Sequence, residues 1–129
     1  MKKERPHNSG TWTSARFRAF ITSALRAASQ KWGPKIEVKR GARVDRGKYQ
    51  CAGYECEPHI VTATLPANKP GGRRIDNALV DHIDPVVDPA TGFVNWDTYI
   101  NRLFVEKEGL QLLCRDCHDR KTAREKEQR

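Results

Sequence analysis

The sequence Leu113-Cys114-Arg115-Asp116-Cys117-His118-Asp119-Arg120-Lys121 places two thiols and an imidazole within five residues. A second segment, Val80-Asp81-His82-Ile83-Asp84-Pro85, supplies another imidazole beside a carboxylate. The two remaining cysteines, Cys51 and Cys56, form another close pair. Thiolates, imidazoles and carboxylates are the side chains that bind divalent metals. The sequence therefore predicts a fold built around metal sites.

The four cysteines are typical of a structural zinc site. Cys114-x-x-Cys117 lets one turn of the chain present two thiolates at about 2.3 Å from a tetrahedral zinc ion, and the looser Cys51-x4-Cys56 pair completes the set. Four thiolates leave no position for a reactive water, so we expect a structural zinc, and both histidines stay free for other chemistry. Such sites supply on the order of 10 kcal/mol of folding free energy in small domains. The alternative is free or disulfide-linked thiols.

Length and charge indicate one domain with an uneven charge distribution. The 129 residues are enough for a single domain with a modest core, although only 37% of them are hydrophobic. Residues 1–48 carry 13 Lys/Arg and 3 Asp/Glu, a net charge of +10, whereas residues 49–129 carry 11 and 13, a net charge of −2. The basic part suits a polyanion, although basic surface can also serve solubility alone.

No apolar segment follows the N-terminus, and no apolar run is long enough to span a bilayer. We therefore expect no secretory signal, no membrane partner and a cytoplasmic location. In a reducing compartment, paired cysteines bind metal more often than they form disulfides.

Hydrophobic periodicity and turn residues predict an α+β chain. Residues 1–13 are expected to form a flexible basic arm, and Ser14 offers an N-cap for an amphipathic helix over 15–32. Gly33-Pro34 ends that helix and a basic connector follows over 35–50. The remaining pattern predicts strands at 60–65, 78–83 and 110–113, loops at 66–74 and 84–95, and helices at 96–104 and 118–126.

The order of these motifs resembles a known family. Asp81-His82-Ile83-x-Pro85 followed by Leu112-Leu113-Cys114-x-x-Cys117-His118-x-x-Lys121 resembles the HNH endonucleases, and the insertion with Gly92-Phe93-Val94-Asn95-Trp96 and Tyr99-Ile100-x-Arg102-Leu103-Phe104 is similar to their small phage-encoded members. The resemblance covers residues 51–126, and it implies that residues 14–129 form a single HNH nuclease domain. Its parts would be a basic helix and connector at 14–48 and a zinc-bound core at 49–129.

The resemblance implies a ββα-metal fold, in which two antiparallel strands near 78–83 and 110–113 and a helix from about 118 enclose one catalytic cation. By position, His82 matches the general base, and Asp81 and His118 match the cation ligands. Taken singly, either histidine could be structural, and His118 could be an idle neighbour of the zinc site.

One position departs from the family pattern. Gly109 stands where the family has its middle asparagine, just before the Leu-x-Leu-Cys strand. The resemblance implies that this asparagine braces the loop or the base. Asn95 or Asn101 could substitute for it.

The expected activity is metal-dependent hydrolysis of double-stranded DNA. An imidazole can accept a proton from water near neutral pH, and a divalent cation such as Mg²⁺, Mn²⁺ or Ni²⁺ can neutralise charge on the phosphate. The products would carry 5′-phosphate and 3′-hydroxyl ends. The expected phosphate contacts are Arg73, Arg74, Arg120, Lys121 and Arg124.

Two other functions are compatible with part of the pattern. A non-catalytic, zinc-stabilised DNA-binding accessory module would need the basic half and the zinc, but not His82. A toxin nuclease of the colicin type is disfavoured because those nucleases lack the four-cysteine zinc. The resemblance to phage proteins also implies a partner such as a terminase or another packaging protein, and a host cytoplasm as the location.

Overall fold

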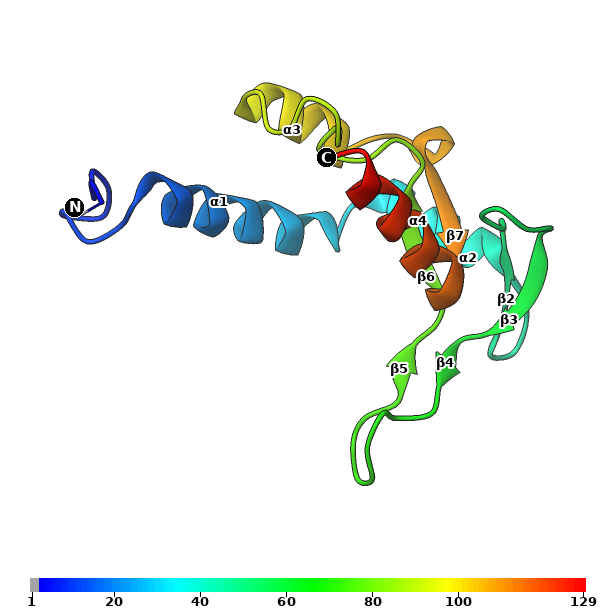
Figure 1. Ribbon diagram of the computed structural model, residues 1–129. Helices are drawn as coiled ribbons and strands as arrows, with labels where there is room; N and C mark the ends of the chain where they lie inside the picture. The colour runs from blue at the N-terminus through cyan, green and yellow to red at the C-terminus, as the bar shows by residue number, and fades with distance from the viewer. Residues whose placement is uncertain (1–2) are drawn as a thin grey trace.

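The computed structural model describes residues 3–129, which form a mixed α+β structure (Figure 1). The prediction of an α+β chain is confirmed. The elements of the described residues are, in chain order, α1 (Ser14–Ser29), α2 (Gly33–Ala42), β1 (Arg43–Asp45), β2 (Lys48–Cys51), β3 (His59–Thr62), β4 (Thr64–Leu65), β5 (Ile75–Asp76), β6 (Leu79–His82), α3 (Trp96–Leu103), the 3-10 helix η1 (Lys107–Gly109), β7 (Leu110–Leu113) and α4 (Arg115–Glu127).

Two strands and the last helix form the part of the fold that carries the predicted site. β6 pairs antiparallel with β7, so that Leu79 lies opposite Leu113 and His82 lies opposite Leu110. One residue after β7, α4 begins, and it contacts both strands. The predicted strands at 78–83 and 110–113 are confirmed. The helix expected from residue 118 starts three residues earlier, at Arg115.

The early start of α4 depends on a buried asparagine. The first N–H groups of a helix have no partner within the helix, and Cys114 at the N-cap position provides no side-chain hydrogen bond. Instead, Oδ1 of Asn77 accepts a hydrogen bond from the backbone N of Arg115 at 3.0 Å. Its Nδ2 donates to the carbonyl oxygen of Thr62, also at 3.0 Å. Asn77 therefore connects the end of β3 to the start of α4.

The N-terminal half contains a helix that the sequence pattern missed. α1 ends at Ser29, and residues 33–42 form α2 where a connector was expected, so that prediction was wrong. The physical reason is Pro34, because proline fits the first turn of a helix as well as it ends a preceding one. Thr13 caps α1 in place of Ser14, accepting from the backbone N of Arg16 at 3.2 Å.

The remaining strands form two small antiparallel sheets. β1, β2 and β3 make one sheet, and β4 and β5 make another. The single strand predicted at 60–65 is therefore divided between two sheets at Ala63. The loop of residues 66–74 joins β4 to β5 and extends away from the rest of the fold, as Figure 1 shows.

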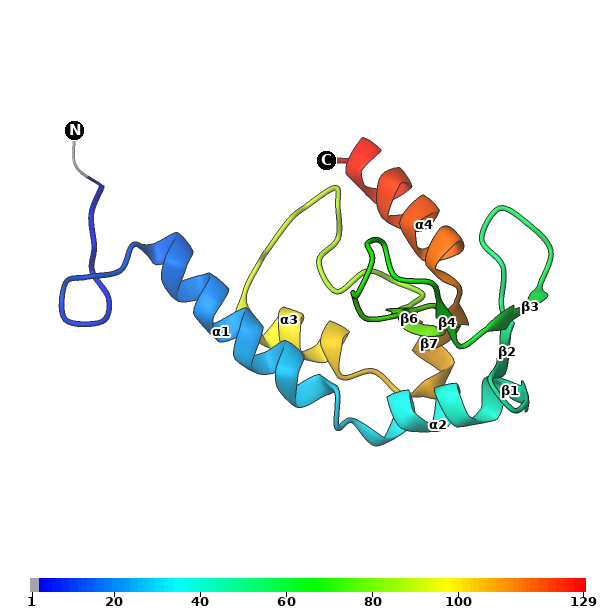
Figure 2. The same ribbon diagram turned by 90° about the horizontal axis from the view of Figure 1, so that it is seen from below.

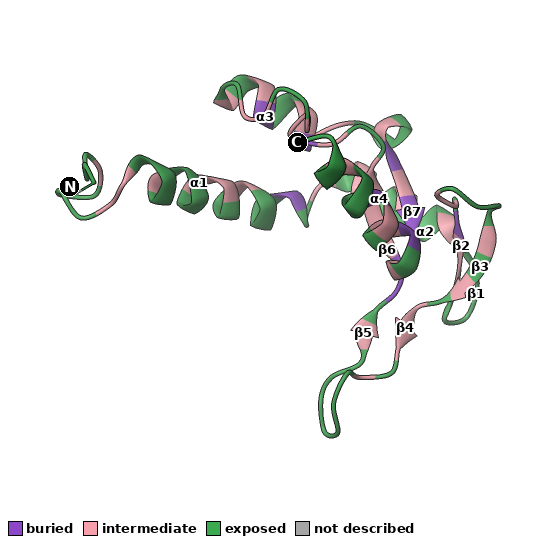
Figure 3. Ribbon diagram, in the orientation of Figure 1, coloured by how far each residue is buried: buried purple, intermediate pink, exposed green. Residues whose placement is uncertain are grey.

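The core consists of two small clusters rather than one large one (Figure 3). One cluster contains Val86, Tyr99 and Leu103, against which Leu25 of α1 packs. α1 lies beside α3 but is otherwise mostly exposed (Figure 2), and Phe20 of its predicted apolar stripe is 55% exposed. The second cluster is made of Cys51, Leu113, Cys114 and Cys117. Three cysteines thus serve as core residues, and the stability of this half depends on what holds their sulfurs together.

Part of the predicted flexible arm has local structure. Residues 7–12 form a turn in which the backbone N of Trp12 donates to the carbonyl oxygen of His7 at 3.0 Å, and the His7 ring stacks on Phe17. Residues 1–2 of the arm lie outside the described residues. Among residues 3–129, no helix is long and apolar enough to cross a membrane.

Candidate functional site

A cluster of four side chains is close enough to hold a metal ion. One ligand atom from each of Cys51, His59, Cys114 and Cys117 lies within 4.8 Å of the other three. The antiparallel register places His59 directly opposite Cys51, and the other two cysteines come from the end of β7 and the first turn of α4. The cluster therefore links β2 and β3 to the junction of β7 with α4, and its donors are ligands that zinc accepts.

Hydrogen bonds orient the donors of this Cys/His cluster. The sulfur of Cys51 accepts from the backbone N of Gly53 at 3.4 Å and from that of Cys114 at 3.3 Å. Nδ1 of His59 lies 3.0 Å from the carbonyl oxygen of Glu57. Because a carbonyl only accepts, Nδ1 carries the proton and Nε2 keeps its lone pair, the arrangement of histidines that bind metals. That Nε2 lies 3.7 Å from the sulfur of Cys114.

The cluster differs from the predicted four-cysteine set. Cys56 is exposed, and its sulfur lies 3.6 Å from the sulfur of Cys117, but it is not among the four mutually close donors. His59 takes that place. His59 was not among the predicted ligands, although the spacing Cys56-x-x-His59 is one that a metal site can use.

A second pair of candidate ligands lies on β6 and α4. Oδ1 of Asp81 is 4.0 Å from Nε2 of His118. Two ligands on one octahedral cation at about 2.1 Å lie roughly 3 to 4 Å apart, so the pair fits a divalent cation between them. The other carboxylate oxygen of Asp81 is 3.2 Å from Nζ of Lys121 and also 3.2 Å from Nε2 of Gln111. The carboxylate is therefore fixed on one side and open to His118 on the other.

His82 is held by the last residue of α3, Leu103. Its Nε2 lies 2.8 Å from the carbonyl oxygen of Leu103, so Nε2 carries the proton and Nδ1 is the atom that can accept one. Burial lowers the pKa of His82, the Leu103 carbonyl partly opposes this, and the positive charge of Lys35 lowers the pKa further. The ring is therefore neutral near pH 7. The structure brings Asp81 and His118 together, whereas the ring of His82 is directed towards α3.

Gly109 packs closely against Val105, so a side chain at this position requires Val105 to shift. A Cβ atom there would lie 3.0 Å from Cγ2 of Val105. Asn95 does not replace the missing side chain, because its Oδ1 caps α3 by accepting from the backbone N of Thr98 at 2.8 Å. Bracing comes instead from Arg102, whose Nε donates to the carbonyl oxygens of Pro85 at 2.8 Å and Val86 at 3.0 Å.

Three of the predicted DNA contacts on α4 bind other parts of the protein. Lys121 is only 8% exposed and donates to the carbonyl oxygen of His82 and to Glu125, both at 2.8 Å, which removes it from the candidate DNA contacts. Arg120 donates to the carbonyl oxygen of Tyr54. Arg124 forms an ion pair with Glu55 at 3.1 Å. Lys121, three residues after His118, faces Asp81 as His118 does and is turned into the protein. Arg120 and Arg124 reach instead towards the segment that contains Tyr54 and Glu55.

Arg73 and Arg74 lie at the other predicted contact region, in the exposed loop before β5. Arg74 donates from Nε to Oγ1 of Thr64 at 2.8 Å, and no salt bridge holds either guanidinium among the described residues. Both remain available to an anion.

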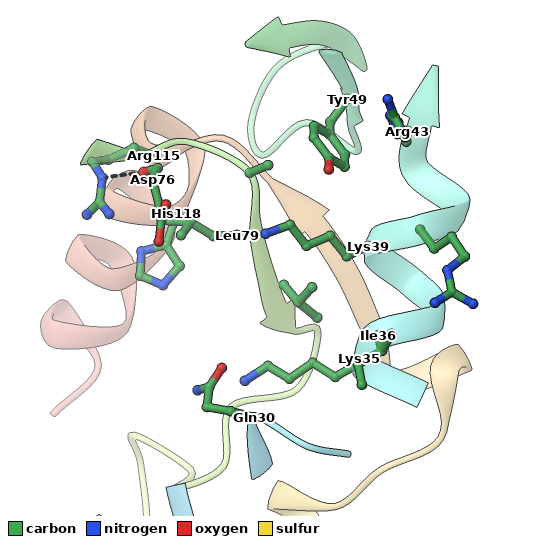
Figure 4. Close-up of a pocket in the computed structure, with 13 residues that line it drawn as sticks. Gln30, Lys35, Ile36, Lys39, Arg43, Tyr49, Asp76, Leu79, Arg115 and His118 are labelled. Atoms are coloured by element: carbon green, nitrogen blue, oxygen red, sulfur yellow. Dashed lines mark hydrogen bonds between the residues drawn. The ribbon is translucent and has the colours of Figure 1, made fainter. Parts of the chain in front are cut away.

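A basic groove lies beside His118. It has a volume of about 750 Å³ and runs between α2, β6 and the first turns of α4 (Figure 4). Its cationic lining residues were not identified from the sequence, although the +10 charge of residues 1–48 was the signal for them. They are Lys35, Lys39, Arg40, Arg43 and Arg115, together with His118.

Comparison of the chain with protein-family models, with curated proteins and with solved structures finds no match to any of them.

Proposed function

We propose that this chain is a metal-dependent endonuclease of the HNH type that hydrolyses phosphodiester bonds of double-stranded DNA. The observation that carries the proposal is the 4.0 Å approach of Asp81 to His118. His82 follows Asp81 in β6, and its ring is directed towards the end of α3. Strands β6 and β7 and helix α4 follow one another in the order that a ββα-metal core requires. The resemblance of the motifs and this arrangement support the same assignment.

The side chains fit a division of roles. Asp81 and His118 would hold a divalent cation such as Mg²⁺, Mn²⁺ or Ni²⁺. When bound, the cation would neutralise charge on the phosphate and assist the departing 3′ oxygen. His82 acts as the general base, because Nδ1 is the acceptor nitrogen and Leu103 fixes the ring through Nε2. The proton of the attacking water goes to Nδ1, and hydrolysis leaves 5′-phosphate and 3′-hydroxyl ends.

The Cys/His cluster fits a structural zinc ion. We propose Cys51, His59, Cys114 and Cys117 as its ligands, because these four donors converge and because the tautomer of His59 leaves Nε2 free to bind. With four protein ligands, the ion has no open position for a substrate or water. Its role is to join β2, β3 and β7 to the first turn of α4, where the proposed ligand Cys117 directly precedes His118.

The second candidate is a DNA-binding accessory module without catalysis. The basic groove favours this alternative, since phosphate binding needs cations and not a general base. The two candidates differ in whether His82 is needed for anything besides folding.

A supercoiled-plasmid assay separates them. The purified, zinc-loaded protein is incubated with plasmid in Mg²⁺, Mn²⁺ or Ni²⁺, and His82→Ala is compared with the wild type after its DNA affinity has been measured. The nuclease predicts nicked or linear DNA with the wild type and intact plasmid with the variant, at equal DNA affinity. Binding without cleavage in every cation would support the accessory module instead.

A further inference from the structure

Helix α2 carries two cations on one face, and a third follows its end. Lys35 and Lys39 are four residues apart, about one helical turn, and Arg43 is the first residue of β1, directly after the helix. All three line the basic groove, and in Figure 4 the side chains of Lys35 and Lys39 extend from α2 towards the side where His118 lies.

These cations have no acidic partners. Among the salt bridges of residues 3–129, none involves Lys35, Lys39 or Arg43. Burial lowers the pKa of Lys35, and the charge of Arg26 lowers it further. Like charges gathered without counter-charges repel one another, so an anion placed among them is attracted strongly.

The opposite wall of the groove leads to the proposed catalytic cation site. Arg115 and His118 line the groove from α4. Nε of Arg115 donates a hydrogen bond to the carbonyl oxygen of Asp76 at 3.0 Å. Asp76 supplies the one carboxylate of the groove lining, and it lies at this end. The floor is formed by residues 78–80, which lead into Asp81.

We propose that the groove holds the phosphate backbone of the DNA strand that is cut, with Lys35 and Lys39 of α2 binding phosphates on one side and His118 of α4 at the scissile phosphate on the other. This inference rests on the proposed nuclease function. In this arrangement α2 forms one DNA-binding wall of the groove, and part of the positive charge of residues 1–48 binds phosphates there.

The arrangement of the charges favours a strand over a small anion. A site for a free phosphate has donors that converge on one point, whereas these cations form a row along α2 and the residue that follows it. Rows of this kind bind successive backbone phosphates without reading the bases. Each phosphate neutralised by a cation releases condensed counterions, so the binding should depend steeply on salt.

The experiment measures binding separately from cleavage. Fluorescence anisotropy with a labelled 20-base-pair duplex is recorded on the zinc-loaded His82→Ala protein, between 50 and 200 mM salt. The test variant adds Lys35→Gln and Lys39→Gln. The matched control adds Arg46→Gln and Lys48→Gln, which remove the same charge from two exposed residues that do not line the groove. Circular dichroism and zinc content verify that both variants fold.

The groove variant should lose roughly tenfold to a hundredfold in affinity, and the slope of log affinity against log salt should become shallower by about 2. The control should change affinity by less than about threefold. Equal losses in both variants, or no loss in either, would overturn the proposal. So would saturable binding of a nucleoside triphosphate that disappears in the groove variant while duplex affinity stays constant.

Failure of the groove and failure of the nuclease give different results. If the wild type never cleaves DNA but the groove variant loses duplex binding, the groove is supported and the nuclease is not. If the wild type cleaves and the groove variant binds normally, the nuclease is supported and the groove is contradicted.

Discussion

The ammonium of Lys121 lies 3.2 Å from Oδ2 of Asp81 and 2.8 Å from the carbonyl oxygen of His82. One side chain of α4 thus holds both the proposed cation ligand and the backbone of the proposed base. Burial lowers the pKa of Lys121, but its bonds to Glu125 and Asp81 outweigh this and raise the pKa above the ordinary value. Lys121 therefore stays charged, and it positions the site.

Replacing Lys121 by methionine should destabilise the fold. The apolar stem stays buried, but Asp81 and Glu125 lose their cationic partner, which costs about 2 to 4 kcal/mol of unfolding free energy. Urea denaturation of the zinc-loaded protein measures the change. Lys126→Met is the control because Lys126 is exposed on the same helix. A Lys121→Met variant within about 0.5 kcal/mol of the wild type would show that the bridge is unimportant.

The ligand set of the zinc site can be tested with a matched pair of variants. Cys56→Ser should keep about one zinc per chain, whereas His59→Ala should bind zinc more weakly, by about tenfold or more. Competition with a chromophoric chelator measures both affinities. The reverse ranking would restore the four-cysteine site that the sequence suggests.

Zinc removal should unfold the C-terminal half. Cys51, Cys114 and Cys117 form a core cluster with Leu113, so loss of the ion removes the link between these buried sulfurs. Zinc sites of this kind contribute on the order of 10 kcal/mol. A strong chelator should abolish the cooperative thermal transition, and Zn²⁺ should restore it while Mg²⁺ does not. A chelated protein with an unchanged transition would contradict this role.

Introducing at Gly109 the asparagine of the HNH pattern that the motifs resemble should not increase the stability of the protein. In Gly109→Asn the new Cβ would meet Val105 at 3.0 Å, and overpacking of this kind costs about 1 to 3 kcal/mol. Gly41→Asn is the comparison, because a Cβ at Gly41 meets nothing within 4 Å. Thermal melting of both variants checks the difference, and a more stable Gly109→Asn would mean that the loop relaxes freely.

The sequence could predict the elements that carry the site. Short apolar runs located β6 and β7, and the Cys-x-x-Cys spacing located the turn into α4. It could not predict α2, because Gly33-Pro34 is compatible with both the end and the start of a helix. Hydrophobic periodicity alone therefore predicted a connector where α2 forms one wall of the basic groove.

Site residues were missed where their role depends on tertiary packing. His59 enters the metal cluster because the β2–β3 register places it opposite Cys51, and a register is not visible in the spacing of motifs. In the sequence, Lys121 resembles a surface charge of a polar helix. In the structure it lies on the side of α4 that faces β6, where it contacts Asp81. Sequence supplied the chemical groups, and packing decided which of them act together.

The most direct test of the central claim is the rate at which saturating, zinc-loaded protein nicks a supercoiled plasmid in Mn²⁺, with and without the His82→Ala substitution. We predict nicking by the wild type, with nicks that DNA ligase reseals because they carry 5′-phosphate and 3′-hydroxyl ends. The variant should be slower by about 10²- to 10⁴-fold at equal DNA binding. Equal rates for the two proteins, or no nicking by the wild type, would contradict the assignment of His82 as the base of a nuclease.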